Sequence, residues 1–476
     1  MKRTRTLLRL VTSTALLVAG SCTSELPPRS QLVLHVDTDA IVPPAVGVAL
    51  GPDDPPPLFD TLLVEVFEPG ATEPCDGCAR QFALDADHFR NGAVSLGIPA
   101  AAGVSGYRAR IRMYPARATL SGEPPAPSAE GVAPTSVVDT VVALPPADGV
   151  VHASVFLATD SVGAPAGTLD APVAPAPGPP GASRVGTWPG ARRIACAGAA
   201  RDGEVCVRGG AFWMGNAKVT GEGEQDAADH LRLVVLAPFF LDATEVTVGR
   251  ARAAGLAADY AWSNGTTGTS FRDYCTYSAT ATGREDLPIN CTTWKTATQF
   301  CRAQGGDLQS EAQFEYVASA QRGRLFAWGE DEPTCDDAVL GRAGWGLLAP
   351  IDSPCKTPAA PGGPLAVGAK VTPPRRDRVE LGGGGTVYDL VGNMCEFTRD
   401  TWNRQAEPCW SHPGVYVDPV CTTVSPADGG AKHVYRGGCW DLTARLATSA
   451  SRESLDDSTT VGLIGLGFRC ARAATP

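Results

Sequence analysis

The stretch Tyr435–Glu453 reads YRGGCWDLTARLATSASRE, and the chain closes soon afterwards with GLGFRCARA at Gly465–Ala473. The first stretch predicts a turn in which an arginine, two glycines, a cysteine and an aromatic residue follow one another. The second stretch carries Gly-Phe-Arg. Cys439 directly follows the glycine pair, but the segment 441–447 contains no thiol. A metal that needs two sulfur ligands would therefore find only one at this turn.

At 476 residues the chain is long enough for two or three domains that each bury a core. Its 53 glycines and 40 prolines indicate many turns and at least one linker. The formal net charge of -11 argues against a nucleic-acid partner, because phosphate binding needs a basic face.

The N-terminus is typical of a secretory signal of the bacterial lipoprotein type. Basic residues precede a short apolar run, which ends in the small residues 19–21 before Cys22. We expect 1–21 to be a removed signal peptide, Cys22 to carry lipid, and 22–30 to tether the exported protein to the membrane of the cell envelope. Thr23, in place of aspartate, points to the outer membrane. The alternative is an ordinary signal peptide with an incidental cysteine.

The cysteine count agrees with export to an oxidising compartment. Without Cys22, the 15 cysteines of the chain leave 14, an even number for which disulfides are the default. Cys75 and Cys78 form a C-x-x-C sequence, but neither a following helix nor a second cysteine pair accompanies it. We expect a local structural disulfide there.

The segment 31–160 follows the two-residue period of β-strands. Ala109, Ile111 and Met113 alternate with arginines, so one face of this strand is apolar and the other is charged. Similar runs between Pro- and Gly-rich turns predict an N-terminal all-β sandwich. Residues 161–191 are dense in Pro, Ala and Gly, which predicts a linker that is extended where proline dominates.

The remaining residues, 192–476, predict an α+β domain with three helices. A threonine of the pair Thr292–Thr293 can cap the first of them. Ser310 and Gln313 fit a capping box that opens the second, and a short third helix begins near Thr247. Gly-rich and aromatic-containing segments surround these helices, so we expect little regular structure in the rest of the domain.

Six motifs of this domain resemble, in the same order, those of the sulfatase-modifying factor family, also called the formylglycine-generating enzyme family. They are Gly209–Gly215 (GGAFWMG), Phe239–Thr247 (FFLDATEVT), Leu308–Tyr316 (LQSEAQFEY) followed by Ala327–Gly329 (AWG), Tyr388–Phe397 (YDLVGNMCEF), Tyr435–Gly438 (YRGG) and Gly467–Arg469 (GFR). The resemblance implies the C-type-lectin-like α+β fold of that family.

The resemblance implies a shared fold, but it does not imply that this chain catalyses the reaction of the family. Enzymes of the family oxidise a substrate cysteine to formylglycine with copper(I) and oxygen, and two cysteine thiolates hold the soft copper ion. The matching positions here are Leu442 and Ala447, neither of which binds metal. We therefore expect no copper and a non-catalytic binding or structural module, a pseudoenzyme. The alternative is a divergent oxidoreductase of the formylglycine-generating type that acts on exported proteins and recruits Cys439.

A structural calcium site is a second feature that the resemblance implies. Its positions here are Asp389, Gly392, Met394 and Glu396, which would offer two carboxylates and two backbone carbonyls to a hard cation. The alternative is that Asp389 and Glu396 only cap a turn.

The resemblance also implies a disulfide between Cys301 and Cys470, whereas the family's other bridge is missing, because its positions are Ala318 and Arg452. We expect the remaining cysteines to pair with one another, although connectivity is not fixed by sequence. The expected pairs are Cys395–Cys439, Cys196–Cys206, Cys275–Cys291, Cys335–Cys355 and Cys409–Cys421.

A binding module of this kind would recognise an unidentified protein or glycan ligand through loops on its rigid frame. Trp402, Trp410 and Arg445 are the candidate binding surface, because aromatic residues and arginine are the usual anchors of recognition surfaces. Arg436 and Trp440 lie close by in sequence, but we expect these two to be buried scaffold residues.

Overall fold

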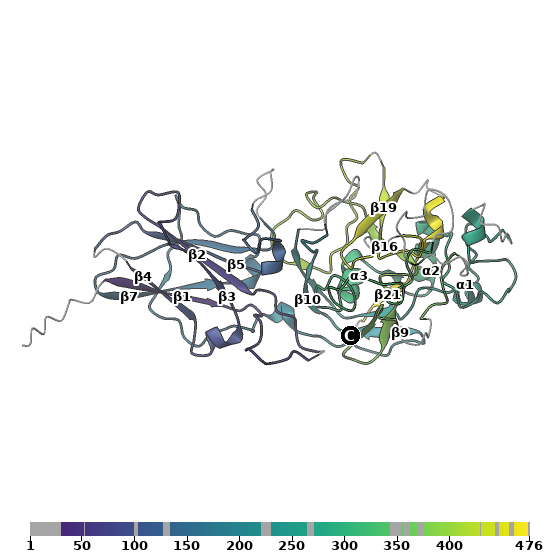
Figure 1. The fold of residues 1–476 in the computed structure, drawn as a ribbon, viewed down its shortest axis with the longest axis horizontal. Coiled ribbons are helices and arrows are strands. Elements are labelled where there is room, and N and C mark those ends of the chain that lie inside the picture. The colour runs from purple at the N-terminus through teal and green to yellow at the C-terminus, as the bar shows by residue number, and fades with distance from the viewer. Residues whose placement is uncertain are drawn as a thin grey trace, which may run out of the picture.

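The computed structural model of the chain describes most of the sequence after Arg29 (Figure 1). The described residues are 30–51, 53–99, 103–126, 134–219, 230–263, 271–342, 355, 362–368, 375–428, 430–442, 447–456 and 461–474. The expected signal peptide, Cys22, which we expect to carry lipid, and Arg445 lie outside them. No helix among the described residues has the length and apolar composition needed to cross a membrane.

The first part of the chain folds into two four-stranded sheets, in the orders β4-β1-β7-β8 and β3-β2-β5-β6 (Figure 1). β1 pairs with β7 in parallel, and the other neighbours are antiparallel. The strands are β1 (Gln31–Thr38), β2 (Thr61–Phe67), β3 (Ala79–Ala83), β4 (Val94–Pro99), β5 (Arg108–Tyr114), β6 (Val138–Ala143), β7 (Val150–Leu157) and β8 (Ala176–Pro177).

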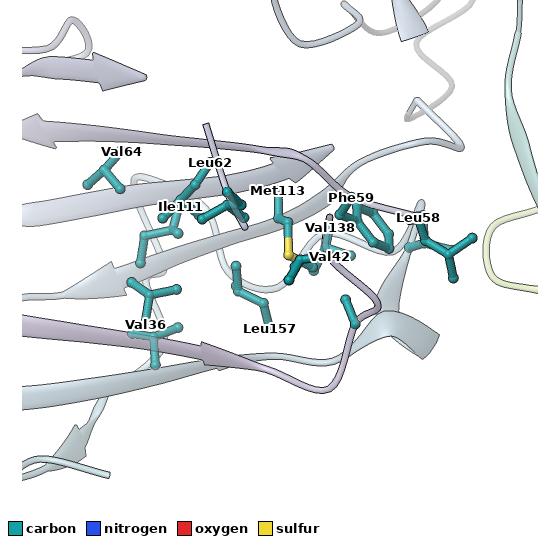
Figure 2. Close-up of a cluster of buried hydrophobic side chains, with 14 of the residues drawn as sticks. Val36, Val42, Leu58, Phe59, Leu62, Val64, Ile111, Met113, Val138 and Leu157 are labelled. Carbon is teal, nitrogen blue, oxygen red and sulfur yellow. The ribbon is translucent and has the colours of Figure 1, made fainter. Parts of the chain in front are cut away.

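Alternation along the strands builds one hydrophobic cluster from both sheets. Ile111 and Met113 of β5 are buried, and they share this cluster with Val36 of β1 and Leu157 of β7. Figure 2 shows these side chains converging on the space between the strands. The apolar face that the sequence predicted for β5 is therefore buried against the other sheet.

The segment 161–191 differs from the extended linker expected from its composition. Ala166 and Val173 form β-bridges to β6, and Ala176–Pro177 adds β8 to the edge of β7. Trp188 is buried in the same cluster as the strands. Composition indicated extended backbone, but it could not show that the backbone would find unpaired strand edges to bond.

The second part of the chain contains four small sheets, with the orders β10-β11-β17, β13-β21-β12-β9, β14-β15 and β19-β18-β16-β20. Their strands are β9 (Glu204–Val207), β10 (Gly210–Met214), β11 (Arg232–Leu236), β12 (Phe239–Asp242), β13 (Asp307–Leu308), β14 (Arg378–Glu380), β15 (Thr386–Tyr388), β16 (Cys395–Thr401), β17 (Tyr416–Val417), β18 (Lys432–Arg436), β19 (Arg452–Asp456), β20 (Leu466–Gly467) and β21 (Cys470–Ala473).

In the part of the chain that the structure describes, three α-helices accompany these strands, and their starts are those that the sequence predicted. They are α1 (Val248–Ala253), α2 (Trp294–Ala303) and α3 (Glu311–Ala318). The side chains of Thr247, Thr293 and Ser310 cap them by accepting backbone hydrogen bonds. Gln313 completes the capping box at α3. The short 3-10 helices among the described residues are Ala86–Phe89, Ala116–Ala118, Thr159–Ser161, Pro189–Ala191, Phe271–Tyr274 and Val461–Ile464.

The two parts of the chain share hydrophobic core around Trp213 of β10. This side chain is buried, meets Phe59 edge-on with ring centroids 5.3 Å apart, and donates from Nε1 to the carbonyl of Leu58 at 2.5 Å. Nearby, Arg117 donates to the carbonyl of Gly323 at 2.7 Å. The first part is therefore packed against the second rather than joined to it only by chain.

Replacing Trp213 with alanine tests this shared core. We expect the Trp213→Ala chain to lose about 3–5 kcal/mol of unfolding free energy, because a large buried side chain leaves a cavity. Urea unfolding without reductant, followed by fluorescence and circular dichroism, measures the loss.

Arg208→Ala is the matched control at the same interface. Its ion pair with Asp53, at 2.8 Å, is partly exposed, so its removal should cost about 0–1 kcal/mol. Equal effects of the two substitutions would contradict a core centred on Trp213.

Candidate functional site

Leu442 and Ala447, which the resemblance matched to the copper-binding cysteines of the family, both lie in apolar packing. Leu442 is partly buried and contacts the cluster around α2. Ala447 is completely buried beside Ala338 and Leu340. A Cβ built on Gly438 would lie 2.5 Å from the methyl group of Ala447, so the backbone at Gly438 packs directly against Ala447. Neither side chain offers an electron pair to a metal.

Every cysteine that the structure describes is in a disulfide, so the described residues contain no free thiol. The expectation of disulfides is confirmed, and the pairs are those expected. They are Cys75–Cys78, Cys196–Cys206, Cys275–Cys291, Cys301–Cys470, Cys335–Cys355, Cys395–Cys439 and Cys409–Cys421.

The Cys395–Cys439 disulfide lies at the centre of the candidate site. It links the start of β16 to the residue after the glycine pair, and both cysteines are buried. Asp441 lies close to this disulfide. A Cβ built on Gly465 would be 2.7 Å from Oδ1 of Asp441 and 3.2 Å from the sulfur of Cys439. The carboxylate oxygen and the sulfur are therefore less than about 6 Å apart.

Asp441 is a buried acid with an unpartnered oxygen. Its Oδ1 is buried and has no hydrogen-bond partner among the described residues, and burial raises the pKa of Asp441 to about 6. The cause is the loss of hydration of the charged form, which favours the neutral acid. Sequence reasoning did not identify this residue, because an aspartate after an aromatic residue carries no signal of its depth.

The arginine of the Tyr-Arg-Gly-Gly turn is a structural residue. Arg436 is buried, forms an ion pair with Glu315 of α3, and donates to the carbonyls of Ala450 and Ser451 at 2.8 and 2.7 Å. Gly437 follows with φ +81, and a Cβ there would lie 2.7 Å from the carbonyl oxygen of Leu390. The expectation that Arg436 and Trp440 are buried scaffold is confirmed.

The two carboxylates expected to bind calcium have other partners. Both oxygens of Glu396 accept hydrogen bonds from Nε of Arg469 at 2.8 Å. Oδ2 of Asp389 accepts from the backbone N–H of Gly368 at 2.6 Å. Among the described residues, no three His, Cys, Asp or Glu side chains gather closely enough to hold a metal ion.

A calcium ion at Asp389, Gly392, Met394 and Glu396 would have to share Glu396 with the guanidinium of Arg469. Two positive charges at one buried carboxylate repel strongly at low dielectric. These four residues, as they are arranged, do not fit the ion.

The expectation of a binding surface at Trp402 and Trp410 is wrong. Both rings are buried, at 4% and 2% exposure. Arg452 lies over both, 4.9 Å from the ring centroid of Trp402 and 5.7 Å from that of Trp410. Arg452 in turn is held by Glu311, at 2.7 Å from Nε. The aromatic rings therefore stabilise a buried cation and are not available to a ligand.

The ion pair Arg452–Glu311 was missed by sequence reasoning. The resemblance matched Arg452 to a disulfide cysteine of the family, so we expected only the loss of that bridge. The available signal was the pair of glutamates Glu311 and Glu315 on one side of a helix whose neighbours are apolar. Two buried glutamates require two buried cations.

These features describe a disulfide-linked α+β domain whose motif residues form its interior. The chain belongs to the sulfatase-modifying factor family: the family model described as the sulfatase-modifying factor enzyme 1-like domain matches residues 194–474. The resemblance inferred from the six motifs is thereby confirmed.

Among curated proteins, the chain is similar to the formylglycine-generating enzyme of Streptomyces coelicolor. The two are 28% identical over 309 residues, which cover 57% of this chain and 90% of that enzyme. Among solved structures, the chain is similar to PvdO from Pseudomonas aeruginosa, at 20% identity, covering 57% of this chain and 94% of that one with a TM-score of 0.35. It is also similar to CarF, at 18% identity, covering 57% and 97% with a TM-score of 0.35.

Asp441 should make the stability of the chain depend on pH. Because its pKa is raised from 3.8 to about 6, its contribution to stability is fully present below pH 4 and is lost as the pH rises through 6. Asp441→Asn removes this loss, so the variant should be more stable than the natural chain at pH 7 by up to about 3 kcal/mol, and equal to it near pH 4.

Urea unfolding of both chains across this pH range measures the difference. Asp331→Asn is the control, because the Asp331 side chain is 80% exposed and its substitution should leave the pH profile unchanged. A difference between Asp441→Asn and the natural chain that is constant with pH would contradict the assignment.

Proposed function

We propose that the chain is a non-catalytic binding or structural module of the sulfatase-modifying factor family, exported and lipid-anchored in the cell envelope through Cys22. One observation carries the proposal: the two positions that would bind copper are packed apolar residues, Leu442 and Ala447. Copper(I) is a soft ion that thiolates hold, and an isobutyl or methyl group gives it no electron pair.

The surroundings of these positions support the same conclusion. Cys395 lies in the motif Tyr388–Phe397, and Cys439 directly follows the motif Tyr435–Gly438. These two cysteines form a disulfide with each other. The charged motif residues Arg436 and Arg469 are used in buried ion pairs and carbonyl contacts. The part of the domain that a partner would contact is its set of disulfide-linked loops. The β-sandwich that we propose for 31–160 precedes this domain in the chain. An acidic chain of this kind suits a protein or glycan ligand and not a nucleic acid.

A divergent formylglycine-generating-type oxidoreductase is the second candidate. The observation that favours it is the position of the Cys395–Cys439 disulfide beside the buried acid Asp441. Reduction of this disulfide would release two adjacent thiols, which are ligands of the type that copper(I) prefers. Both cysteines are buried, however, so a substrate would reach them only after the surrounding loops moved.

An oxygen-uptake assay separates the two functions. The full chain is mildly reduced, loaded with copper(I), and given a cysteine-containing sulfatase peptide while oxygen is followed. We expect no uptake above that of the Cys395→Ser/Cys439→Ser double variant, because both of these cysteines are buried and Leu442 and Ala447 supply no thiolate. Peptide-dependent uptake that the double variant lacks, with formylglycine detected by mass spectrometry, would replace our proposal with the oxidoreductase.

The lipid anchor is tested separately. Expressed in a bacterial host, the chain should incorporate labelled palmitate and partition into the detergent phase of a Triton X-114 extract. Cys22→Ser should abolish both, because the lipid is carried by this thiol. Equal labelling of the two chains would rule out lipidation at Cys22 without bearing on the oxygen-uptake result.

A further inference from the structure

Four arginines meet at one turn of backbone between the two parts of the chain, just after the end of α3 (Figure 1). Arg322 and Arg324 belong to the turn and flank Gly323. Arg117 reaches the turn from a 3-10 helix of the first part, and Arg193 reaches it from the segment that precedes β9. Arg324 is exposed and the other three are partly buried, so the cluster is open to solvent.

Hydrogen bonds to neutral groups hold two of these side chains at the turn. Arg117 donates from Nη1 to the carbonyl of Gly323 at 2.7 Å. Arg193 donates from Nη2 to the carbonyl of Gln321 at 3.2 Å and from Nη1 to the hydroxyl of Tyr316. Burial raises the pKa of Tyr316 to about 12, so this hydroxyl is uncharged at neutral pH. None of these acceptors carries the negative charge that would neutralise a guanidinium.

The two arginines of the turn itself also lack a charged partner. Arg322 donates from Nη2 to the carbonyl of Gly51 at 2.5 Å. The side chain of Arg324 makes no hydrogen bond or ion pair with the described residues. Nε of Arg193 is buried and likewise has no hydrogen-bond partner among them. Because a guanidinium carries five N–H donors, most of the donors in this cluster are not used by the described part of the chain.

No carboxylate among the described residues forms an ion pair with any of the four arginines. Three nearby carboxylates are each paired with another cation: Asp53 with Arg208, Glu330 with Lys218, and Glu315 with Arg436. Two more, Asp54 and Asp60, accept hydrogen bonds from the backbone N–H groups of Gly51 at 2.7 Å and Ala116 at 2.6 Å. The carboxylates around the turn therefore have other partners.

The cluster carries an excess of positive charge. The C-terminus of a helix is equivalent to roughly half a negative charge, so the end of α3 offsets only a small part of the charge of four arginines. Asp54 and Asp60 act at longer range, and together with the helix they still leave more than one positive charge unbalanced. Burial, followed by the neighbouring Arg193 and Arg324, lowers the pKa of Arg322, because like charges repel a partly desolvated cation. An anion bound at the turn would relieve this repulsion.

The number of arginines favours a phosphate group over a carboxylate. A single guanidinium can satisfy both oxygens of a carboxylate, whereas a phosphate group carries about 1.5–2 negative charges and three strong acceptor oxygens. Several arginines at one turn can bond different oxygens of the same group. Partial burial strengthens such charge-assisted hydrogen bonds relative to those made in bulk water.

We propose that Arg193, Arg322 and Arg324 form an anion site that binds a phosphate group at the junction of the two parts of the chain, with Arg117 adding its charge from the first part. The group is a free phosphate ion or the phosphomonoester headgroup of a lipid, since both present the same oxygens to the arginines. The site is independent of the function proposed above, which depends on other residues.

Isothermal titration calorimetry of the full chain with sodium phosphate, at pH 7.5 and constant ionic strength, tests the site. We expect saturable binding of one phosphate per chain. Arg324→Ala should weaken this binding about 10-fold or more, because it removes a charge-assisted hydrogen bond. Arg324→Lys should retain part of the affinity, because lysine keeps the charge but lacks the planar fork. Arg324 is exposed, so circular dichroism should show that both variants fold like the natural chain.

Vesicles distinguish the two sources of the phosphate group. The chain carrying Cys22→Ser is sedimented with phosphatidylcholine vesicles that contain or lack phosphatidic acid. Cosedimentation that requires both phosphatidic acid and Arg324 assigns the site to a lipid headgroup. Phosphate binding in the calorimeter without such cosedimentation assigns it to a free phosphate ion.

Arg302→Ala is the matched control. Arg302 is an arginine of the same domain whose side chain is 63% exposed and pairs with Asp307, so its substitution should leave the phosphate affinity unchanged. The absence of saturable phosphate binding, or binding that neither Arg322→Ala nor Arg324→Ala weakens, would overturn the proposal. Binding of a poly-glutamate peptide in preference to phosphate, with the same dependence on Arg324, would also overturn it.

Discussion

Two buried arginines hold the second domain together. Arg436 reaches Glu315 across 121 residues of sequence, and Arg469 reaches Glu396 across 73. Removing such charges from water is expensive, and their mutual attraction offsets the cost only when the remaining donors also find acceptors. Most of them do: Arg436 donates to the carbonyls of Ala450 and Ser451, and Arg469 to those of Tyr388 and Asp242. Nε of Arg436 makes no hydrogen bond with the described residues but lies 3.9 Å from Oε2 of Glu311. In a domain of short strands and long loops, these contacts determine where the loops lie.

This role changes what the family motifs mean in this chain. The Tyr-Arg-Gly-Gly and Gly-Phe-Arg motifs contribute the two arginines. Their partners Glu315 and Glu396 come from the motifs Leu308–Tyr316 and Tyr388–Phe397. None of these groups is available to a substrate, because each is buried and bonded. The motifs can therefore be retained for folding, whatever stands at the positions that we matched to the family's cysteine pair. Membership of the family and possession of its chemistry are separate properties, and the motifs report the first.

Sequence reasoning succeeded where the determining interaction is local. Thr293 and Ser310 cap helices because a side-chain oxygen reaches a backbone N–H three residues ahead, which is readable from spacing. It failed where the determining interaction is distant. Trp402 and Trp410 looked like surface anchors, but they are buried by Arg452, whose own position depends on Glu311, 141 residues away. Likewise, the proline-rich segment 161–191 gave no sign that β6 and β7 would present free edges to it.

The disulfides complement the ion pairs by acting mainly on the unfolded chain. In the chain-entropy model, Cys301–Cys470, separated by 169 residues, contributes about 5 kcal/mol, and a bridge such as Cys196–Cys206, separated by 10, about 3 kcal/mol. The long bridge opposes global unfolding, whereas short bridges such as Cys409–Cys421 fix individual loops that have little hydrogen-bonded structure of their own. Loops fixed in this way lose less conformational entropy when a ligand binds them. The same cross-links that leave no free thiol among the described residues therefore also hold these loops in one arrangement.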